Sequence, residues 1–492
     1  MKFPLPRNPF PPVQLTPHQE RDLELLADQL LQRTVDEYDH FLHIQNREVD
    51  KTKWKHVKTR ENMSVYKSFG DMSNDPHMLS HDAMMTPRGS RLSSSSVSGV
   101  RLLGVGSIVG NFADLMYAAT TLDDGDMKIK SSYIPDECVD WRLLKVLKHG
   151  TEEDPFLCHT IKWVVKQAPG ATSVIVRPRD MIILDCNGLI QMPTGERLGY
   201  MMHQSIEIPE WGELEGIVRC QVSACYLFRI QNANSVEVYM RSLIDAGGNV
   251  TDFISAVSSA NALIATWKLP WGGQNKKLSW MLKQASAKRA DANTAVLGAR
   301  KVSKSKEPCP LCQKSVSMLR SVAQCELCFK QVCSRCLTVR KISHIRRSGE
   351  LIQKPTAFCK QCVTQASQLD STDIIRIDCI PKGYNNRSEA TTMASISDSA
   401  YDPYRPSSVD SEAWTMTPMS RPDVWETGSV QIESSDDWER DQMQRANRAP
   451  SEPSGFSQQQ QPLWMQMNQL RLAAEQAYQL TKQNENAMHQ LH

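Results

Sequence analysis

The chain has 492 residues, of which 40% are hydrophobic and 23% charged, and its formal net charge is +2. This composition is ordinary for a folded protein, and the length allows two or three domains. No run approaches the 18 consecutive apolar residues of a membrane-spanning helix, so any membrane contact is expected to be peripheral. The start, MKFPLPRNPF, lacks the apolar segment of a signal peptide. We therefore expect a cytoplasmic protein with reduced cysteines. No nucleic-acid partner is expected.

The first element is predicted to be a helix that begins at residue 17. Thr16 suits the N-cap, Pro17 suits the first helical position, and Gln19 completes a capping box. Over about seven turns, apolar residues then recur at three- and four-residue steps. They are Leu23, Leu26, Leu30, Leu31, Val35, Tyr38 and Leu42. One stripe of this helix should therefore be buried.

The next segments are predicted in turn as strand, insertion and helix. Residues 54 to 66 resemble a strand, and residues 69 to 98 are rich in Ser, Met and Pro without periodicity, which is typical of a disordered insertion. Residues 105 to 121 can form a second helix. From 127 to 242 the pattern changes to that of strands.

Two of these strands alternate apolar and charged residues. In the first, Lys162 and Lys166 alternate with apolar residues, and in the second Glu237 and Arg241 do so, which predicts one buried and one wet face. Segments 174 to 176 and 181 to 184 are instead continuously apolar, as in central strands covered on both faces.

A closing helix follows Gly247 and Gly248. Its apolar stripe runs to Trp267 and should be buried against the sheet, lining a cavity. The stripe consists of Val250, Phe253, Ile254, Val257 and Ile264.

This order of elements resembles the START-like helix-grip fold, in which a curved antiparallel sheet wraps a long C-terminal helix around an apolar ligand cavity. Three local segments carry the resemblance, which covers about residues 17 to 287. They are RPRDMIIL at 177–184, YMMHQSIEIP at 200–209 and GIVRC at 216–220. The resemblance implies an α+β fold and an apolar lipid ligand. Another α+β fold with a filled core is the alternative.

Eight cysteines within residues 309 to 362 form four CxxC pairs separated by 12, 4 and 22 residues. Two residues between thiolates let one turn present both sulfurs to one ion, so eight sulfurs make two closed structural zinc sites, and two Zn²⁺ per chain are expected. The second and third pairs lie too close together to wrap one ion, which favours interleaving. The expected ligands are Cys309, Cys312, Cys333 and Cys336 for one zinc, and Cys325, Cys328, Cys359 and Cys362 for the other.

This spacing resembles FYVE-type and FYVE-related zinc fingers over residues 306 to 368. A RING finger also interleaves two zincs, but it normally places a His among its middle ligands. The basic stretch with which FYVE domains bind phosphatidylinositol 3-phosphate is missing, because this chain has Val322, Ala323, Gln324 and Glu326 there. The resemblance therefore implies the scaffold without specific recognition of that headgroup.

Charge is distributed unevenly around the finger. Residues 288 to 347 hold 14 Lys or Arg against three acids, and 288 to 305 are interpreted as a basic linker. Residues 371 to 460 are acidic, rich in Ser and predicted to be disordered. Residues 462 to 490 are predicted as a short amphipathic or coiled-coil helix that could bind protein partners.

No catalytic motif is present, and we expect no enzymatic activity. His159 and His203 are lone histidines in predicted strands, and Arg179 with Asp180 could form a pair at a cavity wall or a structural salt bridge. The favoured hypothesis is a lipid-binding adaptor that docks on proteins or on endosomal and other anionic membranes. A RING-like ubiquitin ligase and a scaffold with a cavity-less START-like domain are the alternatives.

Overall fold

The computed structural model describes residues 3–5, 9–69, 99–168, 176–208, 211–248, 250–295, 308–314, 322–346 and 348–379. The expected insertion, most of the acidic tail and the C-terminal helix at 462–490 therefore lie outside the described residues, as does the apolar run at 174–175. None of the helices in the described ranges is long and apolar enough to cross a membrane.

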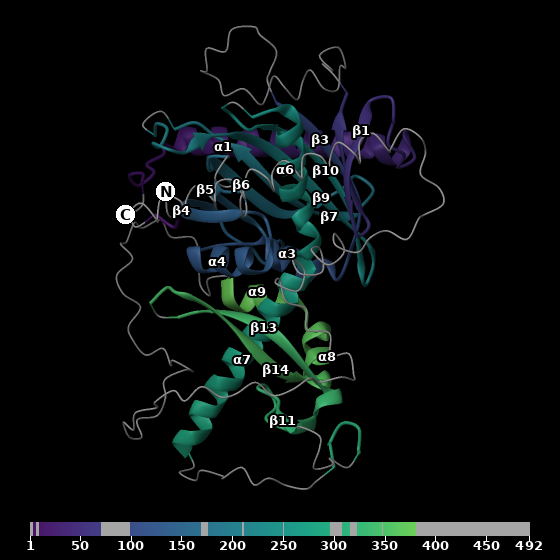
Figure 1. The fold of residues 1–492 in the computed structure, drawn as a ribbon, viewed down its shortest axis with the longest axis vertical. Helices are drawn as coiled ribbons and strands as arrows, with labels where there is room; N and C mark the ends of the chain where they lie inside the picture. Colours follow the sequence, from purple (N-terminus) through teal and green to yellow (C-terminus); the bar gives the residue numbers. More distant parts are fainter. Residues whose placement is uncertain are drawn as a thin grey trace, which may run out of the picture. The chain divides into compact units, whose positions relative to one another are not determined.

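A large sheet of ten strands lies in the upper half of the view in Figure 1. Its strand order is β1-β2-β3-β10-β9-β7-β6-β5-β4, all neighbours on this path are antiparallel, and β8 pairs in parallel with β6. The strands are β1 (Trp54–Arg60), β2 (Met63–Ser68), β3 (Val100–Val109), β4 (Cys138–Lys148), β5 (Cys158–Lys166), β6 (Arg179–Gln191), β7 (Arg197–Ser205), β8 (Val218–Arg219), β9 (Gln221–Asn232) and β10 (Ser235–Asp245). The single strand expected over residues 54 to 66 is thus a hairpin, β1 and β2.

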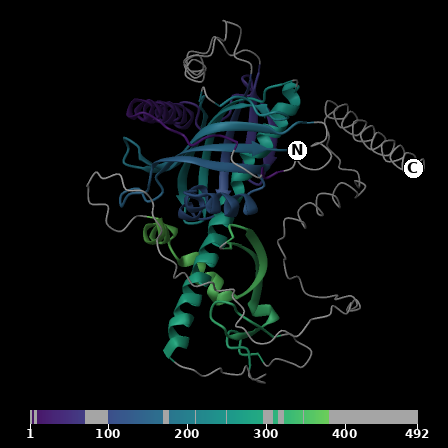
Figure 2. The same ribbon diagram turned by 90° about the vertical axis from the view of Figure 1, so that its left-hand side faces the viewer.

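Helix α1 (Pro17–His43) covers one face of the sheet, and α6 (Asp252–Ile264) lies on the opposite face (Figure 2). The predicted start of α1 is confirmed, since Thr16 and Gln19 form both bonds of a capping box. The buried stripe, with Leu30, Val35 and Tyr38, packs on β-sheet residues such as Leu227. An antiparallel sheet with a C-terminal helix on one face confirms the α+β fold class predicted from the sequence.

The helix expected over residues 105 to 121 is wrong in its first third. Residues 100 to 109 form strand β3. Helix α3 (Phe112–Ala119) starts only after Asn111, whose side chain accepts hydrogen bonds from the amides of Ala113 and Asp114. A second helix, α4 (Asp124–Tyr133), follows where strands were expected. The strand ends at Val109 and is followed by Gly110, whose φ of +141° is unfavourable for other residues.

Helix α6 corrects the predicted buried stripe. Phe253 and Ile254 are 72% and 47% exposed, whereas the buried positions include Ala256, Ala260 and Leu263. The expected stripe does line a cavity beside the sheet, through Val250, Phe253, Ile254 and Val257, but the residues that let the helix approach the sheet closely are small ones. A 3-10 turn, η1 (Ala265–Lys268), leads from α6 into the long helix α7 (Leu269–Ala295).

The charged faces of the alternating strands are buried rather than wet. Lys162 is 2% exposed, and Glu237 and Arg241 are 6% and 9% exposed. Arg241 Nε lies 2.8 Å from a carboxylate oxygen of Glu37 on α1. Glu237 forms ion pairs with Arg229 and Arg47. Because α1 covers this face of β10, its charges are paired, as burial requires.

Beyond α7 the described chain adds two small hairpins and two helices, of which α9 follows the finger. They are β11 (Val322–Gln324) with β12 (Gln331–Cys333), the 3-10 turn η2 (Ser334–Cys336), β13 (Leu337–Ile345) with β14 (Leu351–Cys359), α8 (Lys360–Gln368) and α9 (Ser371–Cys379). Helix α9 corrects the expectation of disorder from residue 371, because Ile374 and Ile375 are each 1% exposed within the core beneath α3. Likewise α7 extends to residue 295, into the expected linker.

Candidate metal centres and an apolar cavity

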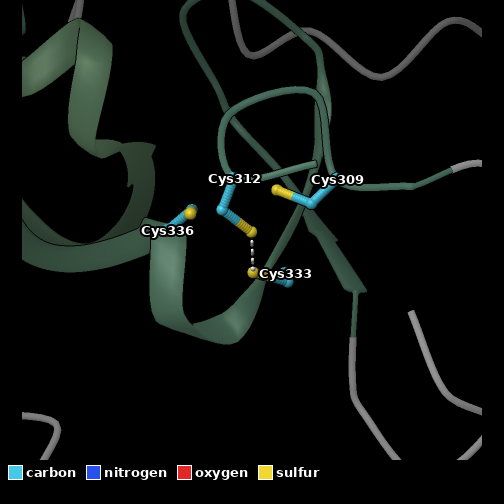
Figure 3. A group of neighbouring side chains, drawn as sticks. All are labelled: Cys309, Cys312, Cys333 and Cys336. Carbon is cyan, nitrogen blue, oxygen red and sulfur yellow. Dashed lines mark hydrogen bonds between the residues drawn. The ribbon is translucent and has the colours of Figure 1, made fainter. Parts of the chain in front are cut away.

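The eight finger cysteines come together as two groups of four. The first consists of Cys309, Cys312, Cys333 and Cys336, and the second of Cys325, Cys328, Cys359 and Cys362, with all ligand atoms of a group within 4.8 Å of one another. Figure 3 shows the first group, in which a loop with Cys309 and Cys312, the end of β12 with Cys333 and the turn η2 with Cys336 bring four sulfurs together. The grouping is the interleaved one that the spacing indicates.

Each group is built on the same backbone turn. The amide of Cys309 donates to Lys314 O, and Gln313, at φ +56°, donates back to Cys309 O. The second group repeats this with Cys325 and Lys330, and Phe329 at φ +60° takes the left-handed position. A CxxC pair therefore presents two sulfurs from a tight turn whose form is set locally.

The sulfur positions fit tetrahedral zinc. Zn–S bonds of about 2.3 Å place two sulfurs of a tetrahedron about 3.8 Å apart. The distance from Cys312 Sγ to Cys333 Sγ is 3.7 Å, and that from Cys328 Sγ to Cys359 Sγ is 3.8 Å. Cys359 is also the N-cap of α8 and accepts from the amide of Cys362. These residues could hold two metal ions, which would close both sites and serve the fold rather than catalysis.

Backbone hydrogen bonds favour the thiolate form of Cys309 in the first group. Burial raises the pKa of Cys309, but the backbone amides of Cys333, Cys312 and Leu311 outweigh it and lower that pKa to about 6. A thiolate is the form that binds metal.

The segment that follows the finger, with Leu369 and helix α9, packs on α3 and α7 of the sheet domain through buried polar contacts. Lys277 Nζ of α7 lies 2.7 Å from Asp114 Oδ1 of α3, with both side chains 1% exposed. Ser371 of α9 donates to the same carboxylate at 2.6 Å, and Lys277 donates to Leu369 O. Gly273 allows α7 to lie this close, because a Cβ there would meet Asp114 O at 2.0 Å.

Helix α4 makes a second set of contacts with the finger. Tyr133 accepts at its hydroxyl from the Ser343 amide at 2.7 Å, and Ser132 Oγ lies 2.7 Å from Ser343 Oγ. Lys128 Nζ donates to Gly349 O. The α4 helix thus has one face on β13 and β14.

The other face of α4 lines an apolar cavity of about 470 Å³, which lies between α6 and the sheet. Strands β5, β6, β7 and β9 supply alternate residues to its wall, among them Val164, Met181, Ile183, Met201, Val222 and Ala224. The exposed Phe253 and Ile254 of α6 belong to the same lining, so the cavity reaches the surface beside them.

A polar cluster lies in this wall, in which Lys162 and Asp185 are buried and His203 is half-buried. Lys162 Nζ is 2.7 Å from Asp185 Oδ2, and His203 Nε2 is 3.6 Å from Asp185 Oδ1. Although burial opposes it, Lys162 holds the pKa of Asp185 well below its usual range, while burial lowers the pKa of His203 to about 4. Near neutral pH the cluster is therefore an ion pair beside a neutral imidazole.

Other predicted residues are placed differently. Asp180 pairs with Arg219 at 2.9 and 3.0 Å and accepts from Trp163, while Arg179 lines the cavity and donates to Ala246 O. Arg179 and Asp180 therefore do not pair with each other, because the side chains of neighbouring residues in a strand point to opposite faces of the sheet. His159 is buried and bonded to the Tyr200 hydroxyl at 2.9 Å.

Sequence reasoning missed Lys130, which lines the cavity from α4. It shares the helix face of Met127 and Ile134, three before and four after it, and both of these are buried. A capping signal at Asp123, which accepts from the Asp126 amide, could have revealed this helix.

Comparisons with known proteins give a likeness at the level of fold. No family model and no curated protein matches the chain. Among solved structures, human STARD10 is 13% identical, with 49% of this chain and 82% of that chain covered and a TM-score of 0.32. Human StAR-related lipid transfer protein 5 is 14% identical, with 53% and 98% covered and a TM-score of 0.32. A STAR-related lipid transfer protein from Xanthomonas axonopodis is 15% identical, with 45% and 99% covered and a TM-score of 0.29. At these values the likeness carries no statement about what this chain binds.

Proposed function

We propose that this chain is a non-enzymatic lipid-binding adaptor, in which the cavity beneath α6 holds the apolar part of a lipid and a two-zinc finger braces the cavity domain. The observation that carries the proposal is the cavity itself. Its volume of about 470 Å³ is within the range of about 300 to 1,000 Å³ typical of ligand sites. Well-packed protein interiors seldom leave a space of this size without a ligand.

The chemistry of the wall supports a lipid. Apolar side chains from four strands and α6 enclose most of the space, and polar groups gather around Asp185. An amphipathic molecule matches such a wall, because its chain removes apolar surface from water at about 25 cal/mol per Å² while its polar end meets the polar cluster.

The finger takes a structural and docking part in this proposal. Eight thiolates and two zinc ions would be held in closed sites, so the metal stabilises the fold. We place the finger with FYVE-type and FYVE-related domains as a scaffold, and we propose that it associates with anionic membranes by charge alone. Gln324 and Glu326, where a specific reader would carry cations, are exposed and not basic.

Filling the cavity tests the proposal. Ala262 lines the cavity from α6, so Ala262→Trp should occupy its space and reduce binding of a fluorescent single-chain lipid by the full chain at least tenfold. Gln29→Trp adds the same side chain on the exposed face of α1 and should leave binding unchanged. Equal binding by both variants and the unaltered chain would show that lipid does not enter the cavity.

A further inference from the structure

The cavity wall carries more positive than negative charge. Four cationic side chains line it, Lys130, Lys166, Arg177 and Arg179, against three carboxylates, Asp136, Glu137 and Asp185. Lys162 lies directly behind Asp185, at 2.7 Å. Counting Lys162, five cations oppose three carboxylates, which leaves a formal excess of two positive charges when every group is ionised.

Two of the carboxylates are already neutralised by neighbours. Asp185 is engaged by Lys162, and Asp136 lies 3.9 Å from Lys166, which also donates to the Asp136 carbonyl. For Glu137, burial raises the pKa and so favours the uncharged form. The three carboxylates of the wall are therefore paired or uncharged without a ligand.

Three cations of the wall, Lys130, Arg177 and Arg179, remain without a carboxylate partner, and Arg177 is exposed. In the described part of the chain no carboxylate oxygen lies within 4.0 Å of any of them, and the hydrogen bonds of Arg179 go to the carbonyls of Ala246 and Arg177. Burial lowers the pKa of Lys130, even though Asp185 acts to raise it. A cation in such surroundings is stabilised by a ligand that brings a negative charge.

The position of Lys130 makes it the group that meets a bound molecule. It projects from α4 into the cavity, on the same helix face as the buried Met127 and Ile134. Lys128, two residues earlier, instead reaches the finger at Gly349 O. The two lysines of one helix thus face different neighbours.

We infer that the cavity ligand is an amphiphile with an anionic oxygen headgroup, a carboxylate or a phosphate, and that Lys130 binds this headgroup. The inference rests on the proposed function, because it assigns the polar end of the lipid that the cavity is proposed to hold. Charge-assisted hydrogen bonds from an ammonium to such oxygens are about twice as strong as neutral ones. A neutral lipid in this cavity would leave Lys130 uncompensated.

Three lipids with one acyl chain separate the possibilities. Oleic acid carries a carboxylate, oleoyl lysophosphatidic acid a phosphate and monooleoylglycerol no charge, and each is titrated into the full chain at about physiological salt. We expect at least one anionic lipid to bind more than tenfold more tightly than the neutral one, about 1.4 kcal/mol. The tighter anionic lipid then identifies the headgroup.

Variants of α4 assign the effect to Lys130. Lys130→Met should weaken the anionic lipid at least tenfold and change the neutral one less than twofold, and Lys130→Arg should retain most of the preference. Lys128→Met is the matched control and should alter neither. Tight binding of the neutral lipid equal to that of both anionic ones, or equal effects of Lys130→Met and Lys128→Met, would overturn the inference while leaving lipid binding intact. Binding of none of the three would overturn the proposed function and the inference together.

Discussion

The buried ion pair between Asp114 of α3 and Lys277 of α7 gives a sharp test of how the segment after the finger is held on the sheet domain, because Ser371 and Leu369 bond to these two side chains. Replacing Lys277 by Met keeps most of the side-chain volume but removes the only cation within 4.0 Å of the Asp114 carboxylate in the described structure. Both side chains are 1% exposed, so water cannot replace the lost partner. Breaking a buried pair in this way typically costs about 3 to 5 kcal/mol.

Protonation of Asp114 sets an upper limit to this cost. Burial already raises the pKa of Asp114, and an unpaired carboxyl can escape its penalty by taking up a proton. From an ordinary pKa of about 3.9, protonation at pH 7 costs about 4 kcal/mol, and at pH 5 about 1.5 kcal/mol. The variant should therefore lose at most about 4 kcal/mol at neutral pH and recover much of it in mild acid, relative to the unaltered chain.

Hydrogen exchange of the full chain reports where the loss appears. We expect faster exchange both in α3, which carries Asp114, and in α9, whose Ser371 bonds the same carboxylate. The double variant Asp114→Asn with Lys277→Met removes both charges and should recover most of the stability. Lys67→Met breaks an exposed pair with Asp252 and should cost less than about 1 kcal/mol. Faster exchange in α9 alone, with α3 unchanged, would refute the idea that α3 and α9 share one buried core.

Three further results are expected. Metal analysis should give two zinc ions per chain, and the Cys333→Ser variant should lose at least one of them. This variant should also loosen α4 as well as the finger, because Tyr133 of α4 bonds Ser343 of β13. Retention of both ions would exclude Cys333 as a ligand. Burial lowers the pKa of His159 to about 4, so the unfolded chain binds an extra proton as pH falls from 6.5 to 4, and stability should drop by up to about 3 kcal/mol there. In urea titrations, His159→Gln should show a shallower drop over that range, and an unchanged slope would contradict the burial argument. Liposome binding should follow total lipid charge. A preference above about tenfold for phosphatidylinositol 3-phosphate over phosphatidylserine of equal charge would contradict this and show that the chain recognises that headgroup specifically.

Local signals were sufficient for several elements. The start of α1 was predictable because a capping box is decided within four residues. The grouping of the cysteines followed from spacing, because a CxxC turn closes on itself and the short gap before Cys333 forces interleaving. The end of β3 also carried a local signal, Gly110 followed by the N-cap Asn111, which the apolar run over 105 to 121 concealed.

Other features depend on partners distant in the sequence. The wet face predicted from the alternation at Lys162 and Glu237 is wrong, because the pattern could not reveal that one polar face lies under α1 and another borders a cavity. The exposure of Phe253 and Ile254 on α6 was missed because both are as apolar as any core residue, although both line the expected cavity. Helix α9 needed the carboxylate of Asp114 to anchor Ser371, a contact across 257 positions.

The most direct test of the central claim is the lipid content of the full chain after purification. Extraction and mass spectrometry should recover about one amphipathic lipid per chain, with an anionic headgroup, and Ala262→Trp should yield much less while Gln29→Trp matches the unaltered chain. Recovery of no lipid, together with no uptake of added lipid, would contradict the account, as would equal recovery from both variants.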